Sequence, residues 1–158
     1  GLRRDAAVVV RGAFVHLPAH GVQLSATEAR IAHKLMPLLA QAGFEGSWAR
    51  DLARACAEPE PLMRTVLARL TQRGELHQVV KDLCYAPSTM AALAGIARRV
   101  AAGAGELSAA QFRDATSLGR KRAIQILEYF DRIGLLRRVG DRHRLRTDST
   151  LFAEAAAA

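Results

Sequence analysis

Aromatic residues make up only 5% of this 158-residue chain, and lysine occurs at three positions alone, Lys34, Lys81 and Lys121. With so few aromatic side chains, base stacking on an aromatic sheet is not the expected way of binding nucleic acid. Cysteine is scarce too: neither Cys56 nor Cys84 belongs to a C-x-x-C pair. This pattern argues against a structural zinc and favours two buried thiols in the reducing cytoplasm.

Long hydrophobic runs and catalytic motifs are also missing. No apolar run approaches the roughly 18 residues of a membrane helix, and no signal peptide opens the chain. Gly119-Arg120-Lys121 is followed by Arg122 and lacks the upstream glycine spacing of a P-loop, so nucleotide hydrolysis is not expected. No His/Asp/Ser or paired-carboxylate arrangement has a supporting context. The sequence therefore predicts no catalytic residue, no metal, no cofactor and no membrane partner.

What the sequence has in excess is positive charge. It holds 23 lysine and arginine residues against 15 aspartate and glutamate residues, a formal net charge of +8 with a pI near 10.7. Nearly all of this charge is carried by arginine, whose planar guanidinium suits phosphate and guanine. Half of the residues are hydrophobic, which is enough for a folded core. The balance indicates a folded protein with a polyanionic partner.

The first half of the chain predicts three helices and a hairpin. Ser25 to Glu28 is a capping box that begins the first helix. Ser47 begins a short second helix, Pro59 or Pro61 opens the third, and Gly74 ends it. Residues 75–85 form a hairpin with Lys81-Asp82 as its turn. The apolar faces of the three helices are Ile31, Leu35, Leu38 and Leu39; Ala49, Leu52 and Ala55; and Met63, Val66, Leu67 and Leu70. Trp48 is expected to be a core anchor between helices.

The second half repeats this order. A helix around residues 90–100 is followed by a second capping box, Ser108 to Gln111, and by a long helix near residues 119–133 that Gly134 stops. Residues 135–146 form another hairpin, with a turn at Gly140-Asp141. A fixed offset of 60 aligns nine positions without gaps: Ala49/Ala109, Leu52/Phe112, Ala55/Ala115, Met63/Ala123, Val66/Ile126, Leu67/Leu127, Leu70/Phe130, Gly74/Gly134 and Leu76/Leu136.

These patterns predict a mainly α fold with small β-hairpin wings, an α+β arrangement of tandem winged-helix modules. We call residues 23–86 unit 1 and residues 87–147 unit 2. Residues 1–22, with strand-like runs in 6–17 and a turn at 18–21, are expected to end a preceding module. Residues 148–158 are expected to be a tail. The abrupt start and the alanine-rich close are typical of the edges of a fragment.

The basic charge is concentrated in unit 2. Residues 20–86 carry eight basic and seven acidic residues, whereas residues 108–146 carry ten basic and four acidic residues. At equivalent helix starts, unit 1 has Glu58 and Glu60 where unit 2 has Arg120-Lys121-Arg122. Positive side chains oppose the dipole at a helix start, which is tolerable where an anion docks. Unit 2 is therefore the predicted nucleic-acid-binding module.

Other residues of unit 2 are more ambiguous. Arg122 and Gln125 lie near the helix start, where base edges can be reached, whereas Tyr129 and Arg132 lie further back and are expected only to cover surface. His143 stands among arginines, where it either touches phosphate or is a solvated wing residue. The sequence leaves both interpretations open.

The stretch from Thr116 to Gly134 resembles the last winged helix of the bacterial selenocysteine-specific elongation factor family, SelB. The strings that carry the resemblance are Gly119-Arg120-Lys121, Ala123-Ile124, Leu127 to Arg132, Arg137-Arg138, Gly140-Asp141 and His143 to Arg146. The resemblance covers essentially residues 10–146, and it is strong in unit 2 and weak in unit 1. At Arg122 the family more commonly has an apolar residue.

The resemblance implies a function. In that family an N-terminal GTPase carries selenocysteyl-tRNA, and C-terminal winged helices bind an mRNA hairpin, the selenocysteine insertion element, near an in-frame UGA codon. This chain would then be the mRNA-tethering region, a cytoplasmic monomer without a cofactor of its own. GTP, Mg²⁺, selenocysteyl-tRNA and the ribosome would be partners of the full-length factor. The implied RNA-binding residues are Arg113, Ser117, Gly119, Arg120, Lys121, Arg122 and Gln125, with Arg142 and Arg144 as backbone contacts in the wing.

RNA fits the physics of such a site. The deep, narrow major groove of A-form RNA does not admit a helix, so proteins read looped bases and hold the stem by its phosphates. A compact Arg/Lys tip suits a hairpin loop better than a long duplex. Two alternatives stay open on the sequence alone: a dimeric tandem winged-helix DNA-binding transcriptional regulator, and a winged-helix protein-interaction module.

Overall fold

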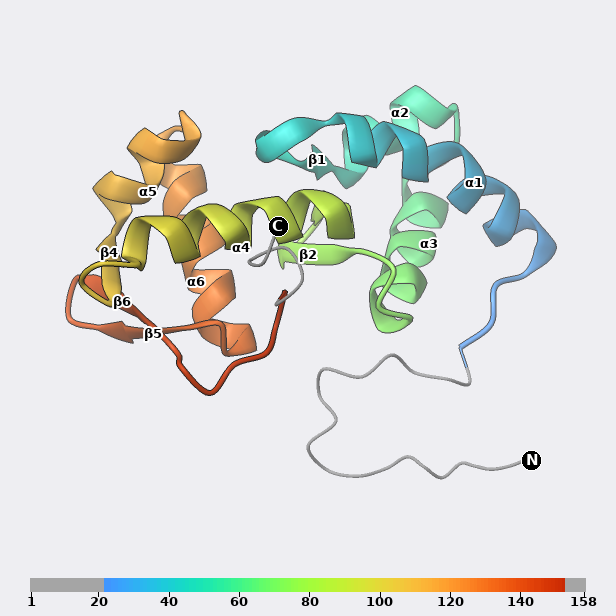
Figure 1. Ribbon diagram of the computed structural model, residues 1–158. Coiled ribbons are helices and arrows are strands. Elements are labelled where there is room, and N and C mark those ends of the chain that lie inside the picture. The colour runs from blue at the N-terminus through green and yellow to red at the C-terminus, as the bar shows by residue number, and fades with distance from the viewer. Residues whose placement is uncertain (1–21, 153–158) are drawn as a thin grey trace, which may run out of the picture.

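The computed structural model describes residues 22–152, which form two winged helices joined side by side (Figure 1). The predicted strand-like runs in residues 6–17 and the turn at 18–21 lie outside the described residues, as does the end of the predicted tail. No helix of residues 22–152 is long and apolar enough to cross a membrane. The same residues contain no cluster of three or more His, Cys, Asp or Glu side chains suited to a metal ion.

Unit 1 begins with the predicted capping box. The Ser25 hydroxyl accepts from the Glu28 N–H at 3.1 Å, and the Glu28 carboxylate accepts from the Ser25 N–H at 2.9 Å, so two of the free N–H groups at the helix start are satisfied. The elements of unit 1 are α1 (Ala26–Gln41), the 3-10 turn η3 (Gly43–Glu45), β1 (Ser47–Trp48), α2 (Ala49–Cys56), α3 (Glu60–Gln72), β2 (His77–Val80) and β3 (Leu83–Tyr85).

Unit 2 follows directly after β3. The second capping box is also present: Ser108 and Gln111 exchange hydrogen bonds of 3.2 and 2.8 Å at the start of the short helix. Gly134 ends the long helix with a φ of 91°, a left-handed conformation that glycine adopts at low cost. The elements of unit 2 are α4 (Pro87–Ala101), β4 (Glu106–Ser108), α5 (Ala109–Thr116), α6 (Arg120–Ile133), β5 (Leu136–Val139) and β6 (Arg142–Leu145).

Each wing belongs to a three-stranded antiparallel sheet, with strand order β1-β3-β2 in unit 1 and β4-β6-β5 in unit 2. The sequence predicted only the hairpins. Ser47 was expected to begin the short helix, but it pairs with Cys84 in β1, and α2 starts at Ala49. The prediction was wrong because strands of two or three residues have no periodicity of their own. They form only because the hairpin supplies a partner 37 residues away along the chain.

The predicted repeat and the fold class are confirmed. Both α2/α5 and α3/α6 begin 60 residues apart, and the helix-ending residues Ala57 and Ser117 share left-handed φ values of 57° and 62°. Six of the matched pairs are buried in both units: Leu52/Phe112, Met63/Ala123, Val66/Ile126, Leu67/Leu127, Leu70/Phe130 and Leu76/Leu136. Ala55 and Ala115 are exposed in both units, so their predicted place on an apolar face was wrong.

Residues 22–152 form two hydrophobic cores, and the core of unit 2 extends into the wing of unit 1. Val79, Leu83 and Tyr85 come from β2 and β3 but pack in the same cluster as the helices of unit 2. The Tyr85 hydroxyl donates to the Phe44 carbonyl at 2.7 Å, and a Cβ on Gly46 would lie 2.6 Å from the Tyr85 ring. Only glycine leaves this ring the room it occupies. The two units therefore share buried surface rather than only a linker.

Several side chains differ from their predicted roles because of this docking. Tyr129 accepts or donates a 2.7 Å hydrogen bond with His77, and Arg132 donates to the Val79 carbonyl, so both hold the wing of unit 1 rather than only cover surface. Trp48 is 37% exposed and is not a core anchor; Leu38 is 38% exposed and lies off the apolar face of α1. Contacts between units decide the positions of Tyr129, Arg132 and Trp48, and helical periodicity does not indicate such contacts.

Candidate nucleic-acid interface

The turn between α5 and α6 is anchored to the core by one buried residue, and its other side is exposed to solvent. Leu118 is buried as its anchor, and the Thr116 hydroxyl accepts from the Leu118 N–H at 3.3 Å while it donates to the Phe112 carbonyl at 2.8 Å. Gly119 is the N-cap of α6 and has no side chain to bond to the first N–H groups of the helix. A Cβ placed on Gly119 would meet nothing within 4 Å. The start of α6 thus presents free N–H groups to solvent.

Arg120 and Lys121 stand on this helix start. Both are exposed, and neither forms an ion pair or side-chain hydrogen bond with any residue in the range 22–152. No acidic residue lies in the first turn of α6 to offset them. The two cations add to the positive end of the helix dipole, which raises the potential there and favours a bound anion.

Arg122 points away from this surface and towards unit 1. Its side chain is only 16% exposed; it donates to the Glu45 carbonyl and forms a 3.1 Å ion pair with the Glu45 carboxylate. Its guanidinium lies 5.5 Å from the Trp48 ring centroid, a cation–π distance. Its Nε donates to the Gln125 amide oxygen at 3.0 Å. Arg122 and Gln125 were predicted together, and the structure brings them together in the contact between the units.

Arg113 and Ser117 complete the turn. Arg113 forms a 3.3 Å ion pair with Asp114, and its carbonyl accepts from the Ser117 N–H at 2.8 Å. Ser117 is exposed in its left-handed conformation. Five of the nine predicted residues, Arg113, Ser117, Gly119, Arg120 and Lys121, therefore gather on one turn.

The wing arginines form a second group. Arg142 and Arg144 alternate with buried His143 along β6, and both reach Glu106 of β4, at 3.4 and 3.9 Å. Arg142 pairs in register with Ser108, the N-cap of α5, whereas Arg120 follows the end of α5. The eight residues of α5 span about 12 Å, so a nucleic acid that touches both groups must extend along this helix.

His143 belongs to the core of the unit rather than to its surface. It is 5% exposed, and its Nδ1 lies 2.9 Å from an Asp131 carboxylate oxygen at the C-terminal end of α6. Both interpretations that the sequence left open, a phosphate contact and a solvated wing residue, are wrong. The alternation of β6 places every second residue inward, and the partly buried Asp131 supplies a polar partner there.

The equivalent helix start in unit 1 is neutralised from within. Glu58, only 10% exposed, binds Lys34 at 2.7 Å and Arg30 at 2.9 Å, and these hydrogen bonds, that from Lys34 foremost, lower the pKa of its carboxyl group. Glu60 forms an ion pair with Arg64 one turn along α3. The helix start that carries unpaired cations in unit 2 therefore carries ion-paired carboxylates in unit 1.

The inter-unit contacts of Glu45 and Trp48 were missed by the sequence reading. Glu45 lies 77 residues from Arg122, and its turn has no pattern that indicates a partner. Trp48 is the only tryptophan of the chain, which was a compositional signal, but it was read as a core residue. Neither local spacing nor the repeat identifies a contact that exists only after the units dock.

Comparison with known proteins identifies relatives of this chain. Residues 98–145 match the family model described as elongation factor SelB, winged helix. The chain is 42% identical over 141 residues to the selenocysteine-specific elongation factor of Escherichia coli (strain K12) and 34% identical over 139 residues to that of Haemophilus influenzae. These alignments cover 89% and 88% of this chain but 22% of each relative, so the chain spans about a fifth of their length.

Two solved structures share the fold. The mRNA-binding domain of elongation factor SelB from E. coli, in complex with SECIS RNA, is 41% identical, with a TM-score of 0.72 over 78% of this chain and 99% of that one. A bacterial selenocysteine-specific elongation factor, EF-Sec, is 21% identical, with a TM-score of 0.63 over 78% of this chain and 20% of that one. The second likeness concerns the fold alone.

Proposed function

Because this chain belongs to the SelB family of selenocysteine-specific elongation factors and corresponds to their winged-helix region, we propose that it binds an mRNA hairpin, the selenocysteine insertion element. Binding would hold the factor on the message close to the UGA codon at which selenocysteine is inserted. The chain acts in this proposal as a tether and carries out no chemistry of its own.

The observation that carries the proposal is the open start of α6. Arg120 and Lys121 are exposed and have no partner within residues 22–152, above N–H groups that no side chain caps. Charge-assisted hydrogen bonds to phosphate are strong, and a compact cationic tip can grip a hairpin loop without entering the RNA groove. Arg113, Ser117 and Gly119 shape the same turn and lie within reach of the same strand.

The remaining predicted residues take different roles in this proposal. Arg122 and Gln125 position the start of α6 against unit 1, since the Arg122 guanidinium is already held by Glu45 and Trp48. Arg142 and Arg144 contact the phosphates of the stem further along α5. Unit 2 therefore carries the hairpin contacts, and unit 1 supports the orientation of its reading helix.

The longer protein has further proposed activities. We propose that it hydrolyses GTP with Mg²⁺, carries selenocysteyl-tRNA and acts on the ribosome in the cytoplasm, as expected for elongation factors of this family. This region is proposed to act as a monomer, because a single module with a short site requires no symmetric partner.

A gel-shift titration tests the proposal directly. A selenocysteine insertion hairpin should bind, and duplex DNA of equal length should bind far more weakly. The logarithm of the association constant should fall with the logarithm of salt concentration with a slope of roughly three to five, since each neutralised phosphate contributes about 0.7 to 0.9. Preference for the DNA duplex would instead support a transcriptional regulator, and a flat salt profile would mean that the charge of unit 2 is only a solvated surface.

A further inference from the structure

The segment that follows β6, residues 146–152, folds back onto the molecule, and we call it the C-terminal segment (Figure 1). Its turns are local. The Arg146 guanidinium forms a 2.9 Å ion pair with Asp148, and the Ser149 N–H donates to the Arg146 carbonyl at 3.3 Å. The Leu151 N–H then donates to the Ser149 hydroxyl at 3.2 Å. These bonds bring the chain back from the end of the sheet to the contact between the units.

Phe152, at the end of this segment, lies against both units. Its ring centroid is 5.8 Å from that of His77 on β2 and 6.2 Å from that of Phe130 on α6. Aromatic rings attract one another at such distances in tilted and edge-to-face geometries. Tyr129, next to Phe130, bonds to His77 at 2.7 Å, so the four rings form one cluster. Leu151 and Phe152 also pack on the core that unit 2 shares with the wing of unit 1.

Arg98, in the last turn of α4, holds the C-terminal segment in place. One terminal nitrogen of its guanidinium donates to the Leu151 carbonyl, the only acceptor that this side chain reaches in residues 22–152. Its Nε is buried and has no hydrogen-bond partner in the same range. Because a buried donor without a partner costs free energy, the bond to the Leu151 carbonyl favours the docked position of the segment.

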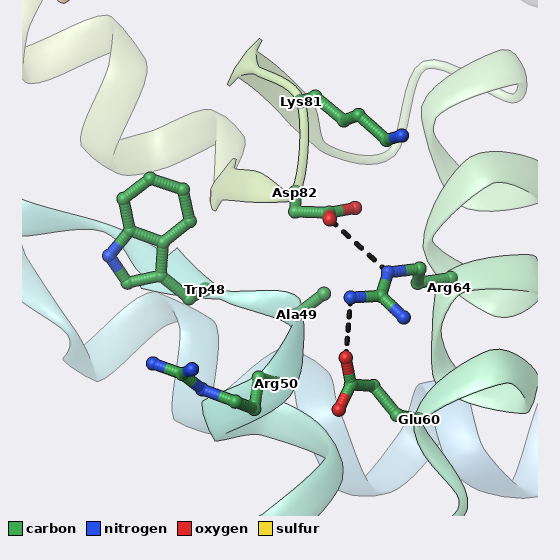
Figure 2. A pocket seen from close by; sticks show the side chains of 7 residues that line it. All are labelled: Trp48, Ala49, Arg50, Glu60, Arg64, Lys81 and Asp82. Carbon is green, nitrogen blue, oxygen red and sulfur yellow. Dashed lines mark hydrogen bonds and ion pairs between the residues drawn. The ribbon is translucent and has the colours of Figure 1, made fainter.

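The wing that carries His77 is fixed to the rest of unit 1. Cys84 of this hairpin packs in the core of unit 1. The turn of the wing borders a pocket of about 460 Å³, which Trp48 also lines (Figure 2). At this pocket Arg64 of α3 forms a 3.2 Å ion pair with Asp82 of the wing turn. A contact with His77 therefore acts on the orientation of unit 1 as a whole.

Unit 1 contacts α6 at two separate places. Close to the start of α6, Arg122 forms its 3.1 Å ion pair with Glu45. Near the other end, Tyr129 bonds to His77. Two separate contacts fix the direction of a helix, whereas a single contact leaves it free to pivot. Phe152 packs at the second of these contacts, so it supports the angle that the first contact requires.

We propose that the C-terminal segment fixes the angle between the units and so positions the start of α6 for the hairpin. Phe152 and Arg98 are its positioning residues: Phe152 joins β2 to α6, and Arg98 holds the backbone next to Phe152. Neither residue touches RNA in this proposal. Without them the angle varies, and the contact that orients Arg122 is made only part of the time. The inference rests on the proposed function for its effect on hairpin binding alone.

The first measurement needs no RNA. Spin labels are attached to the whole chain at Ala29→Cys on α1 and Ala92→Cys on α4, two exposed positions in different units. Double electron–electron resonance should give one narrow distance distribution in the parent protein. Phe152→Ala and Arg98→Met should each broaden it, and the double variant should broaden it no further, because both act through one segment. Arg99→Met removes the same charge from the exposed neighbouring residue and should leave the distribution narrow.

The second measurement is hairpin affinity. Phe152→Ala and Arg98→Met should each weaken binding about fivefold, the scale on which residues without ligand contact act. Their salt dependence should stay that of the parent protein, since no phosphate contact is lost. Phe152→Leu keeps much of the apolar contact and should restore most of the affinity. Arg99→Met should stay within about twofold of the parent protein.

Other results would overturn this role of the C-terminal segment. Narrow distributions in both variants, or equal broadening by Arg99→Met, would show that the segment does not set the angle. A broadened distribution with full hairpin affinity would show that the angle does not position α6. A salt slope reduced by about one in Arg98→Met would make Arg98 a phosphate ligand. If Phe152→Ala does not fold, Arg98→Met decides the outcome.

The two proposals fail in different ways. If the parent protein does not bind the hairpin while Phe152→Ala and Arg98→Met still broaden the distance distribution, the proposed function alone is refuted. If the parent protein binds the hairpin and neither variant changes the distribution, the inference about the C-terminal segment alone is refuted.

Discussion

The two units place opposite charges on the same scaffold. In unit 1 two glutamates stand at the start of the third helix. Glu58 forms ion pairs with Arg30 and Lys34, and Glu60 forms one with Arg64. In unit 2 the equivalent helix begins with two cations that have no partner in residues 22–152. Both third helices begin at the same position of the repeat, and the residues that end the preceding helices, Ala57 and Ser117, are left-handed in both units. The two helix starts therefore differ in whether their charges are already paired inside the protein, and this difference is the basis for proposing a binding surface in unit 2.

The contrast also indicates what unit 1 contributes to a module that is proposed to carry the hairpin contacts. Val79, Leu83 and Tyr85 of unit 1 pack in the core of unit 2. Glu45 of unit 1 forms an ion pair with Arg122 on α6. In the proposed function the two units act as one support for the turn between α5 and α6. Four experiments can break or sharpen this division of roles.

The largest effect is expected from Tyr85→Ala, which tests whether the units fold as one. Tyr85 is 1% exposed and packs in the core of unit 2 although it belongs to the wing of unit 1. Truncating a buried aromatic ring costs about 3–5 kcal/mol of unfolding free energy. Urea unfolding followed by Trp48 fluorescence and by far-ultraviolet circular dichroism should show the same shifted midpoint. A fluorescence transition that moves while half of the helical signal stays in place would show that the units are independent.

The next effect concerns the difference at the helix starts. Arg120→Glu with Lys121→Glu should lower hairpin affinity by at least about 2 kcal/mol, or some 30-fold, through lost phosphate contacts and added repulsion. The melting temperature should not fall, because acidic residues in a first turn suit the helix dipole.

The matched control for this pair is Arg54→Glu with Arg99→Glu, which should weaken binding far less. The reversal in unit 1, Glu58→Arg with Glu60→Lys, is a poorer control because it breaks the ion pairs of Glu58 with Lys34 and Arg30. If the Arg120/Lys121 variant keeps full hairpin affinity and an unchanged melting temperature, these two residues do not bind the hairpin. Arg142 and Arg144 in the wing would then be the candidates for that contact.

A smaller effect should appear where the units meet. Arg122→Gln should weaken hairpin binding by about 1 kcal/mol, the scale of one lost ion pair that orients a contact. Glu45→Gln, which removes a negative charge and touches no RNA in the proposal, should give part of the same loss. The double variant should be no worse than Arg122→Gln, since both act through one contact. Additive losses, or tighter binding by Glu45→Gln, would make Arg122 a direct reader.

The smallest effect is a pH dependence that His77 of unit 1 introduces at the contact between the units. Burial lowers the pKa of His77, which bonds to Tyr129 across the interface, whereas burial raises the pKa of Tyr129 to about 12. With a folded pKa below the ordinary 6.5, the unfolded chain binds the proton more tightly, so stability is complete above about 6.5 and falls as the pH drops below it. The loss between pH 7.5 and 5.0 should be about 1 kcal/mol or less and absent in His77→Leu. Urea midpoints at the two pH values measure it, and an equal loss in both proteins would assign it elsewhere.

Much of this molecule is encoded in local sequence. The capping boxes at Ser25 and Ser108, the stop at Gly134 and the turn at Gly140-Asp141 each use hydrogen bonds or φ angles within a few residues. Helical periodicity and the offset of 60 residues then predict the winged-helix repeat, because apolar positions and stop glycines recur at the same spacing in both units. The concentration of charge in unit 2 is likewise a property of the sequence alone, and so is the contrast between Glu60 and Arg120.

The tertiary structure decided what those charges and side chains do. Arg120 and Arg122 belong to the same basic run, yet within residues 22–152 only Arg122 forms an ion pair, because Glu45 comes into reach of it across 77 residues. Trp48 became a wall of a pocket and His143 a buried partner of Asp131 for the same reason. Periodicity records which side of a helix a residue occupies. Periodicity does not indicate which residues of the other unit contact that side, because docking depends on the shape and packing of both units together.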